Sequence, residues 1–455
     1  MAHVSEIGNN RRMSILRPTR RTVITGLAAL AAPAIIGRAS ADDSVSPYDF
    51  GLQNEADGVD QTSAIQQAID AAAQGGKDLR LPSGEYFVRG LQFPSYMRVI
   101  GSPRATHLIS FDEGTIGRVG AGSGFVIDGV SFVGVRDAAA LTLEASDDAT
   151  IRNCSFSGPG IGIEASAAGA TIEDCRFEGL ADAAIHSSNS RGLFIRGNRI
   201  SDCGNAGIRI WRDEAGLDGS IVTGNSISRI DWRGGGNGQN GNGVNVFQAD
   251  GVIVADNVIS DCAFTAVRVN AGRNTQVRGN TCLNSGEVAI FSEFGFSGSV
   301  IADNIIDGAA TGIDITNLDS GGYLATCTGN IVRNIFPSSS VNPDTRPVGI
   351  YAEADTVVAN NVIENVPGIG IAAGYGPFVR DVSVTDNVLT ACTTGIGVTV
   401  VVDPQVGDVN VSGNTISGAT AGGIVGMEWE TVVTDDLARD AGKYTHVTVA
   451  GNTVR

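Results

Sequence analysis

The sequence has few aromatic side chains, few basic ones and, after residue 41, no long apolar run. Phe, Tyr and Trp together make up 6% of the 455 residues, whereas glycine occurs 61 times. This composition is typical of many short β-strands joined by tight turns, and it argues against a helical protein. A membrane-spanning helix requires about 20 consecutive apolar residues, so we expect no membrane span in the mature chain.

Basic residues are too few to balance the acidic ones. The chain has 31 Lys and Arg against 49 Asp and Glu, which gives a net charge of −18. Six of the arginines and one acid lie in residues 1–41, so residues 42–455 carry 25 basic and 48 acidic side chains. Such a surface repels nucleic acid and anionic lipid, and it repels a polyanionic glycan unless a cation bridges the two. We therefore expect no nucleic acid partner.

The first 41 residues have the features of an export signal. Arg20 and Arg21 precede a weakly apolar Ala/Gly/Ile stretch, and Ala39 and Ala41 form a small-x-small cleavage site. The paired arginines resemble a twin-arginine translocation signal, which implies a periplasmic or secreted protein; an ordinary secretory signal is the alternative. Either Met1 or Met13 could be the start.

A hexapeptide recurs along the rest of the chain. VTGNSI at Val222 has related copies at intervals of 21 to 38 residues, a period that indicates a solenoid. Each repeat contains a strand, a bend at the recurring Asn, a second strand and a third strand of the form Gly-Ile-x-Ile. We predict an all-β chain, a parallel β-helix of about 13 rungs. At each bend the Asn side chain should face inward and bond its counterparts above and below. These ladder residues are Asn198, Asn225, Asn257, Asn280, Asn304, Asn330, Asn361, Asn387, Asn414 and Asn452.

Two other residue types follow the repeat. Most of the seven cysteines occupy positions expected to face the core, where free Cys behaves as an apolar residue. We expect free thiols, with Cys154 and Cys175 as the one pair close enough for a bridge. Four aspartates precede the repeat position and form turns in our interpretation, although a stacked acidic column could bind Ca²⁺ weakly: Asp174, Asp256, Asp303 and Asp386. We expect no cofactor and no other metal.

The segment before the repeats differs from them. Apolar residues from Ala64 to Ala72 have helical spacing, Asp60 or Thr62 can cap the helix, and Gly75-Gly76 ends it. The pattern D-F-G, D-G-x-x-D-x-T-x-A-I-x-x-A-I, G-G and P-x-G-x-Y resembles the opening of pectate-lyase-like right-handed β-helix proteins. That resemblance implies that the helix covers the N-terminal end of a right-handed coil. We therefore divide the mature chain into a cap, residues 42–90, and repeats, residues 91–455.

In the pectate-lyase-like proteins that this chain resembles, ligands lie on the outer face of the strand that corresponds here to the Gly-Ile-x-Ile strand. We align its first outward column as Gly162, His186, Arg209, Asn245, Arg268, Phe291, Asp314, Tyr351, Gly370 and Gly397. The second column is Glu164, Ser188, Trp211, Phe247, Asn270, Glu293, Thr316, Glu353, Ala372 and Thr399. Aromatic and polar side chains concentrate from His186 to Glu353, as in a sugar-binding cleft, and the insertion 231–243 should wall it. The predicted ligand contacts are His186, Arg209, Trp211, Asn245, Phe247, Asn270, Tyr351 and Glu353. An irregular exposed sheet without a ligand is the alternative.

Candidate catalytic residues follow from the same columns. Glu293 and Asp314 lie on adjacent rungs, and the distance between their carboxylates could suit either the retaining or the inverting geometry of glycoside hydrolysis. Arg268 could lower the pKa of one of these carboxylates or act as a base in β-elimination. The NTD, GHG and RIK set of polygalacturonases and the DPH motif of alginate epimerases are missing from the sequence. Export and repeat together resemble a family of twin-arginine-translocated repeat-containing proteins of unknown function. We therefore predict a protein that binds or processes a carbohydrate, with a non-catalytic envelope or surface protein as the alternative. The oligomeric state is left open.

Overall fold

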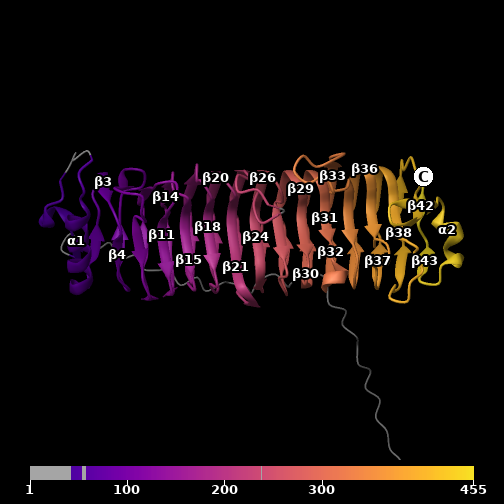
Figure 1. Cartoon of the computed structure of the whole chain (residues 1–455), viewed down its shortest axis with the longest axis horizontal. Helices are drawn as coiled ribbons and strands as arrows, with labels where there is room; N and C mark the ends of the chain where they lie inside the picture. Colours follow the sequence, from indigo (N-terminus) through magenta and orange to yellow (C-terminus); the bar gives the residue numbers. More distant parts are fainter. Residues whose placement is uncertain (1–42, 54–57, 237) are drawn as a thin grey trace, which may run out of the picture. The chain divides into compact units, whose positions relative to one another are not determined.

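The computed structural model describes residues 43–53, 58–236 and 238–455. The predicted leader, with its signal residues Arg20, Arg21, Ala39 and Ala41, lies outside the described residues. Residues 43–455 form a parallel β-helix of about 14 turns, one more than the 13 expected. Its strands stack along one axis from α1 to α2 (Figure 1).

Each turn contributes a strand to three walls, which enclose an apolar core. The first wall is a 16-stranded sheet. Its strands are β1 (Ser44–Val45), β2 (Asp78–Arg80), β5 (Arg98–Ile100), β9 (Val126–Asp128), β13 (Ala149–Arg152), β16 (Ala170–Glu173), β19 (Phe194–Arg196), β22 (Ile221–Thr223), β25 (Ile253–Ala255), β28 (Gln276–Arg278), β30 (Ser297–Ala302), β32 (Tyr323–Thr328), β35 (Thr356–Ala359), β37 (Val382–Thr385), β39 (Val409–Ser412) and β43 (Val447–Ala450).

The second wall follows the Asn bend. Its strands are β3 (Gly84–Val88), β6 (Thr106–Ser110), β10 (Ser131–Val133), β14 (Ser155–Ser157), β17 (Arg176–Glu178), β20 (Arg199–Cys203), β23 (Ser226–Ile230), β26 (Val258–Cys262), β33 (Ile331–Ile335), β40 (Thr415–Ser417) and β44 (Thr453–Val454).

The third wall carries the Gly-Ile-x-Ile strands. They are β4 (Leu91–Phe93), β7 (Gly117–Val119), β11 (Ala139–Glu144), β15 (Ile161–Ser166), β18 (Ala183–Ser188), β21 (Ala206–Leu217), β24 (Asn242–Asp250), β27 (Val267–Asn270), β34 (Val348–Ala352) and β41 (Ile424–Glu428). Four long strands run through the corner between the second and third walls: β29 (Thr281–Glu293), β31 (Ile305–Ile315), β36 (Val362–Ala373) and β38 (Val388–Thr399). The remaining strands are β8 (Gly122–Ser123), β12 (Ser146–Asp147) and β42 (Thr431–Thr434).

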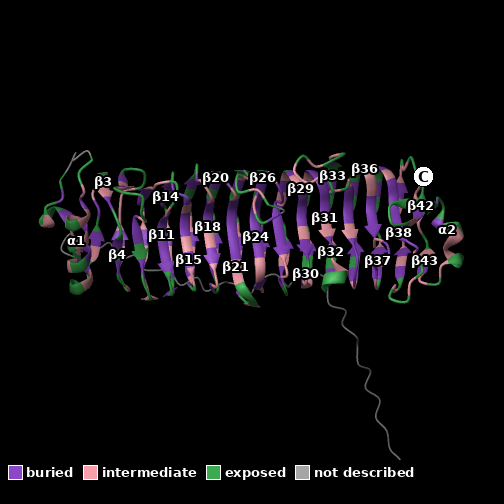
Figure 2. Cartoon of the chain, in the orientation of Figure 1, coloured by how far each residue is buried: buried purple, intermediate pink, exposed green. Residues whose placement is uncertain are grey.

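The repeat sets the register of the coil. Val222 pairs with Ile195 on one side and Val254 on the other, so equivalent positions of successive hexapeptides lie side by side. Because side chains alternate along a strand, this register stacks the aliphatic residues inward. Figure 2 shows the strands buried and the exposed residues gathered at the turns.

The expected asparagine ladder is present at the bend. Asn225 donates from Nδ2 to Asn257 Oδ1 at 2.9 Å and to the Ile195 carbonyl at 3.0 Å, and equivalent bonds continue from Asn198 to Asn452. The side chains are buried except at Asn452, on the last rung, which is partly exposed. The ladder therefore satisfies polar groups that the coil would otherwise bury without partners.

The residue before each ladder position adopts a left-handed backbone. Asp256 has φ 58° and Gly279, on the next rung, has φ 65°. This conformation favours Gly, Asn and Asp, which explains the residues found there. A Cβ at Gly279 would lie 2.5 Å from Asp256 Oδ1, so glycine makes room for the aspartate below it. The four aspartates are thus turn formers, and they do not stack on one another as the Ca²⁺ alternative requires.

The cysteines are free and buried, including Cys154 and Cys175. At the N-terminal end, α1 (Thr62–Gly75) packs its apolar face against the core, as predicted. The formal N-cap is Gln61, and the Asp60 side chain accepts the Thr62 amide at 3.0 Å. Gly76 ends the helix in a left-handed conformation.

The other helices are short: η2 (Pro47–Phe50), η3 (Leu318–Ser320), α2 (Leu437–Asp440) and η4 (Ala441–Lys443). Leu437 of α2 is buried in the core at the C-terminal end, so the segment that contains α2 covers part of that end. Within the described ranges, no helix has the length and apolarity needed to cross a membrane.

Candidate functional site

The outer face of the third wall carries the predicted columns, with a correction at both ends. Glu164, not Gly162, pairs with His186, and Ala372, not Gly370, pairs with Tyr351. From His186 to Tyr351 the alignment of the first column agrees with the structure, through Arg209, Asn245, Arg268, Phe291 and Asp314. The predicted site residues therefore do lie on one face, but the structure divides them among three clusters.

The first cluster is aromatic and surrounds Trp211. The His186 ring lies 5.4 Å and the Phe247 ring 6.1 Å from it, both edge to face. Arg209 lies beside Trp211 and makes a bidentate ion pair with Asp182, with both distances 2.9 Å. Burial and the adjacent Arg209 lower the pKa of His186, so this histidine is neutral at pH 7.

The second cluster is a cavity of 390 Å³ around Arg268. Trp211, Phe247 and Phe294 line it, together with Asn245, Asn270 and Glu293. Gly238 and Gln239 complete the lining, so the insertion 231–243 does wall this part of the face.

Arg268 and Glu293 are bound to each other inside that cavity. Arg268 donates to both Glu293 carboxylate oxygens, at 2.6 and 2.8 Å, and to Glu287 at 3.0 Å. Asn270 donates to Glu293 Oε1 at 2.8 Å. Both members of the ion pair are buried. A carboxylate held by three donors is poorly placed to accept a proton from a substrate or to attack one.

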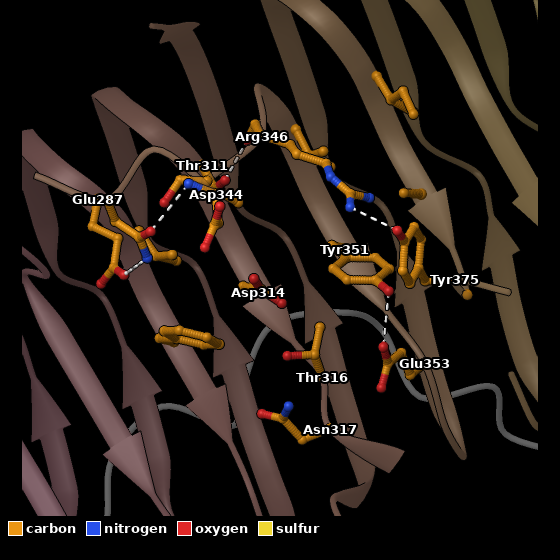
Figure 3. A pocket seen from close by; sticks show the side chains of 18 of the residues that line it. Glu287, Thr311, Asp314, Thr316, Asn317, Asp344, Arg346, Tyr351, Glu353 and Tyr375 are labelled. Atoms are coloured by element: carbon orange, nitrogen blue, oxygen red, sulfur yellow. Dashed lines mark hydrogen bonds between the residues drawn. The ribbon is translucent and has the colours of Figure 1, made fainter. Parts of the chain in front are cut away.

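The third cluster is a pocket of 310 Å³ that contains Asp314. In Figure 3 Asp314 lies at its centre, with Glu287 and Asp344 on one side and Tyr351 and Glu353 on the other. These residues come from β29, β31, β34, the position directly after β34, and the connection between β33 and β34. The structure therefore places Asp314 with Glu353, whereas Glu293 lies in the neighbouring cavity.

The two carboxyl groups of this pocket differ in their surroundings. Asp314 Oδ1 is shielded from solvent and has no hydrogen-bond partner among the residues that the structure describes. Glu353 accepts the Tyr351 hydroxyl at 2.8 Å and the Leu318 amide at 2.8 Å. Burial raises the pKa of both, and the nearby Glu353 charge raises the pKa of Asp314 further. The pKa of Asp314 is raised well above its ordinary value in spite of a hydrogen bond with Thr316, whereas two donors stabilise the anion of Glu353.

Trp429 also lines this pocket, and our sequence analysis missed it as a site residue. It lies between β41 and β42, an antiparallel pair, and has φ 56°, which is unusual for an aromatic residue. Its ring lies 4.9 Å from that of Tyr375 and is half exposed. Arg346 joins Glu430, next to Trp429, at 2.6 Å and the Tyr375 hydroxyl at 2.9 Å. This hairpin does not belong to the repeat, so the tryptophan itself is the only signal in the sequence that could have indicated it.

Comparisons with known proteins agree with the fold. Residues 118–234 and 160–328 match the family model described as the right handed beta helix region. No curated protein sequence matches the chain.

Among solved structures, the N-terminal fragment of bacteriophage phi29 gene product 12 is similar, with a TM-score of 0.52, 12% identity, and coverage of 86% of this chain and 73% of that one. The pre-mature form of the same phage protein has a TM-score of 0.50, 13% identity, and coverage of 84% of this chain and 63% of its own. The chain thus spans less than two thirds of that protein.

A DFA-IIIase from Arthrobacter chlorophenolicus A6, in complex with GF2, has a TM-score of 0.49 and 16% identity, with 77% of this chain and 95% of that one covered. At these identities the likeness shows the fold alone. A fold does not imply a function, so activity must be argued from the site.

Proposed function

We propose that this chain is an exported protein that binds a carbohydrate along the third wall and cleaves it in the pocket between Asp314 and Glu353. The single observation that carries the proposal is the Asp314 carboxyl, which lies shielded in a pocket beside a second carboxylate and has one oxygen without a partner in the described part of the chain. An unsatisfied buried polar atom costs stability, so its retention is typical of a functional site.

The two carboxyl groups suit the two roles of glycoside hydrolysis. Asp314 holds a proton that it can donate to the glycosidic oxygen as the bond to the sugar breaks. Glu353, oriented by Tyr351 and the Leu318 amide, either takes a proton from the attacking water or attacks the anomeric carbon itself. Either route consumes one water and leaves a new reducing end.

Aromatic rings lie where sugar rings could stack. Tyr375, Trp429 and Phe291 line the pocket, and Trp211 and Phe247 lie on the same face several turns away. The apolar faces of sugars pack on such rings while hydroxyl groups reach the neighbouring polar side chains. We propose that the cavity around Arg268 serves binding only, because its carboxylate is already paired.

The second candidate is a non-catalytic surface protein that binds a glycan without cleaving it. The ion pair between Arg268 and Glu293 favours this candidate, because a carboxylate that is already paired can contribute to a binding surface without taking part in catalysis. The two candidates share the binding face and differ only in the role of Asp314 and Glu353.

A glycan array and an assay for newly released reducing ends separate the candidates. We expect the wild type to release reducing ends, and Asp314→Asn and Glu353→Gln to lower the rate by at least about 100-fold while they still bind. Glu164→Gln, on the same wall but outside the pocket, is the matched control and should keep full activity. Binding without release supports the non-catalytic candidate, and failure to bind any glycan refutes both.

A further inference from the structure

The Asp314 pocket is lined by four acidic side chains and one basic one among the described residues. The acids are Glu287, Asp314, Asp344 and Glu353, and the base is Arg346. A pocket that recognises an anionic sugar needs a cation that is free to pair with it. The first question is therefore whether Arg346 is free.

Arg346 is already occupied by groups at the rim. Its Nη2 lies 2.6 Å from Glu430 Oε1 and donates to the Tyr375 hydroxyl at 2.9 Å. The guanidinium also lies over the Tyr375 ring, 4.3 Å from its centre. An anionic ligand would have to displace Glu430 to reach it.

The acids, in contrast, exceed their cationic partners. Glu287 shares Arg268 with Glu293, so two carboxylates divide one guanidinium. Glu353 is held by neutral donors, which orient it without cancelling its charge. Asp344 is exposed at the rim, and in Figure 3 its carboxylate points into the pocket above Asp314. The electrostatic potential in the pocket is therefore negative even when Asp314 is protonated.

We propose, on the basis of the function proposed above, that the glycan bound in this pocket carries no negative charge there: it is a neutral or amino sugar, and uronic acids are excluded. A uronate carboxylate near Asp344 and Glu353 would meet repulsion on both sides, whereas the ammonium of an amino sugar would pair with Asp344. Two charges a few ångströms apart change affinity by about 100-fold in a partly buried site, and screening at an exposed rim reduces this to about tenfold.

A bound divalent cation is the one route by which a uronate could still enter. The described part of the chain has no group of three or more His, Cys, Asp or Glu side chains placed to hold a metal ion. Binding is measured both with Ca²⁺ and with EDTA, so that any bridging of a uronate by a cation is detected.

The experiment compares an anionic oligosaccharide with its neutral, carboxyl-reduced form and adds a cationic one. Oligomers of polygalacturonate, the same oligomers after reduction of their carboxyl groups, and chitosan oligomers are titrated into the full chain by calorimetry. Asp344→Asn and Asp344→Lys test the rim charge. Glu113→Lys, an exposed acid several turns away, is the control for net charge.

We expect carboxyl-reduced oligomers to bind at least about tenfold more tightly than the uronate form. Asp344→Lys should narrow that ratio and weaken chitosan binding by about tenfold, whereas Glu113→Lys should change neither. The inference is overturned if the uronate form binds as tightly as its reduced form, with Ca²⁺ or without, or if Asp344→Lys leaves the ratio unchanged. Failure of every oligomer, together with an empty glycan array, would refute the proposed function itself.

Discussion

Substitution of a single buried ladder asparagine should destabilise the whole coil. The Asn304 side chain takes part in four hydrogen bonds: it accepts from the amide and the Nδ2 of Asn280, and it donates to Val277 O and Asn330 Oδ1, at 2.9 to 3.0 Å. At about 1 kcal/mol each, their loss in Asn304→Ala should cost about 4 kcal/mol, because no water can replace them in the core.

Asn452→Ala is the matched control for that prediction. Asn452 also makes four hydrogen bonds, but it lies on the last rung and is partly exposed, so water can satisfy its partners. We expect a cost of about 1 kcal/mol there. Urea denaturation followed by circular dichroism measures both, as shifts of the midpoint at constant slope. Equal losses of unfolding free energy in the two variants would show that the burial of a ladder asparagine does not determine how much it stabilises the fold.

Three further results are expected. Asp314→Asn should raise Tm at pH 8 but not at pH 4. The raised pKa of Asp314 stabilises the folded chain only in acid, and this contribution is lost as pH rises from the ordinary carboxyl range through the raised pKa. An equal gain in Tm at both pH values would contradict this prediction. Trp429→Gly should weaken glycan binding by about three- to tenfold while Tm stays nearly constant, because relief of the left-handed backbone offsets lost ring contacts; calorimetry and thermal melts measure both, and undiminished binding would exclude Trp429 as a platform. Replacement of Arg20 and Arg21 by Lys should leave the precursor in the cytoplasm by cell fractionation, whereas continued export would favour an ordinary secretory signal.

The sequence predicts the coil well because the information is local. An alternating apolar pattern and a bend residue recur within each hexapeptide, and both face the core whatever the neighbouring rungs do. The Asn ladder and the inward cysteines follow directly, and the structure shows both. The helix α1 follows from its own periodicity in the same way.

The ends of the outward columns could not be predicted, because a shift of two residues leaves every side chain on the same face. A Cβ at Gly162 would meet the ring of the core residue Phe177, and only the pairing with the next rung shows that Glu164 lies beside His186. The alternative of a stacked acidic column that binds Ca²⁺ does not hold, for a related reason. Asp256 and Asp303 are separated by a rung with Gly279 at the same position, which a list of aspartates does not show.

The division of the site was likewise beyond the sequence. Glu293 and Asp314 occupy neighbouring rungs, yet Arg268 and Asn270 donate hydrogen bonds to Glu293, while Asp314 Oδ1 has no partner within the described ranges. Such pairing depends on side-chain conformation and cannot be inferred from spacing. Trp429 reaches the pocket through a hairpin that belongs to no repeat.

The most direct test of the central claim is a crystal structure of the Asp314→Asn variant with the oligosaccharide that the wild type cleaves fastest. We expect a sugar in the pocket, with a glycosidic oxygen within hydrogen-bond distance of residue 314, the anomeric carbon facing Glu353, and a ring packed on Trp429. A sugar bound only around Arg268 and Trp211, with the Asp314 pocket empty, would contradict it.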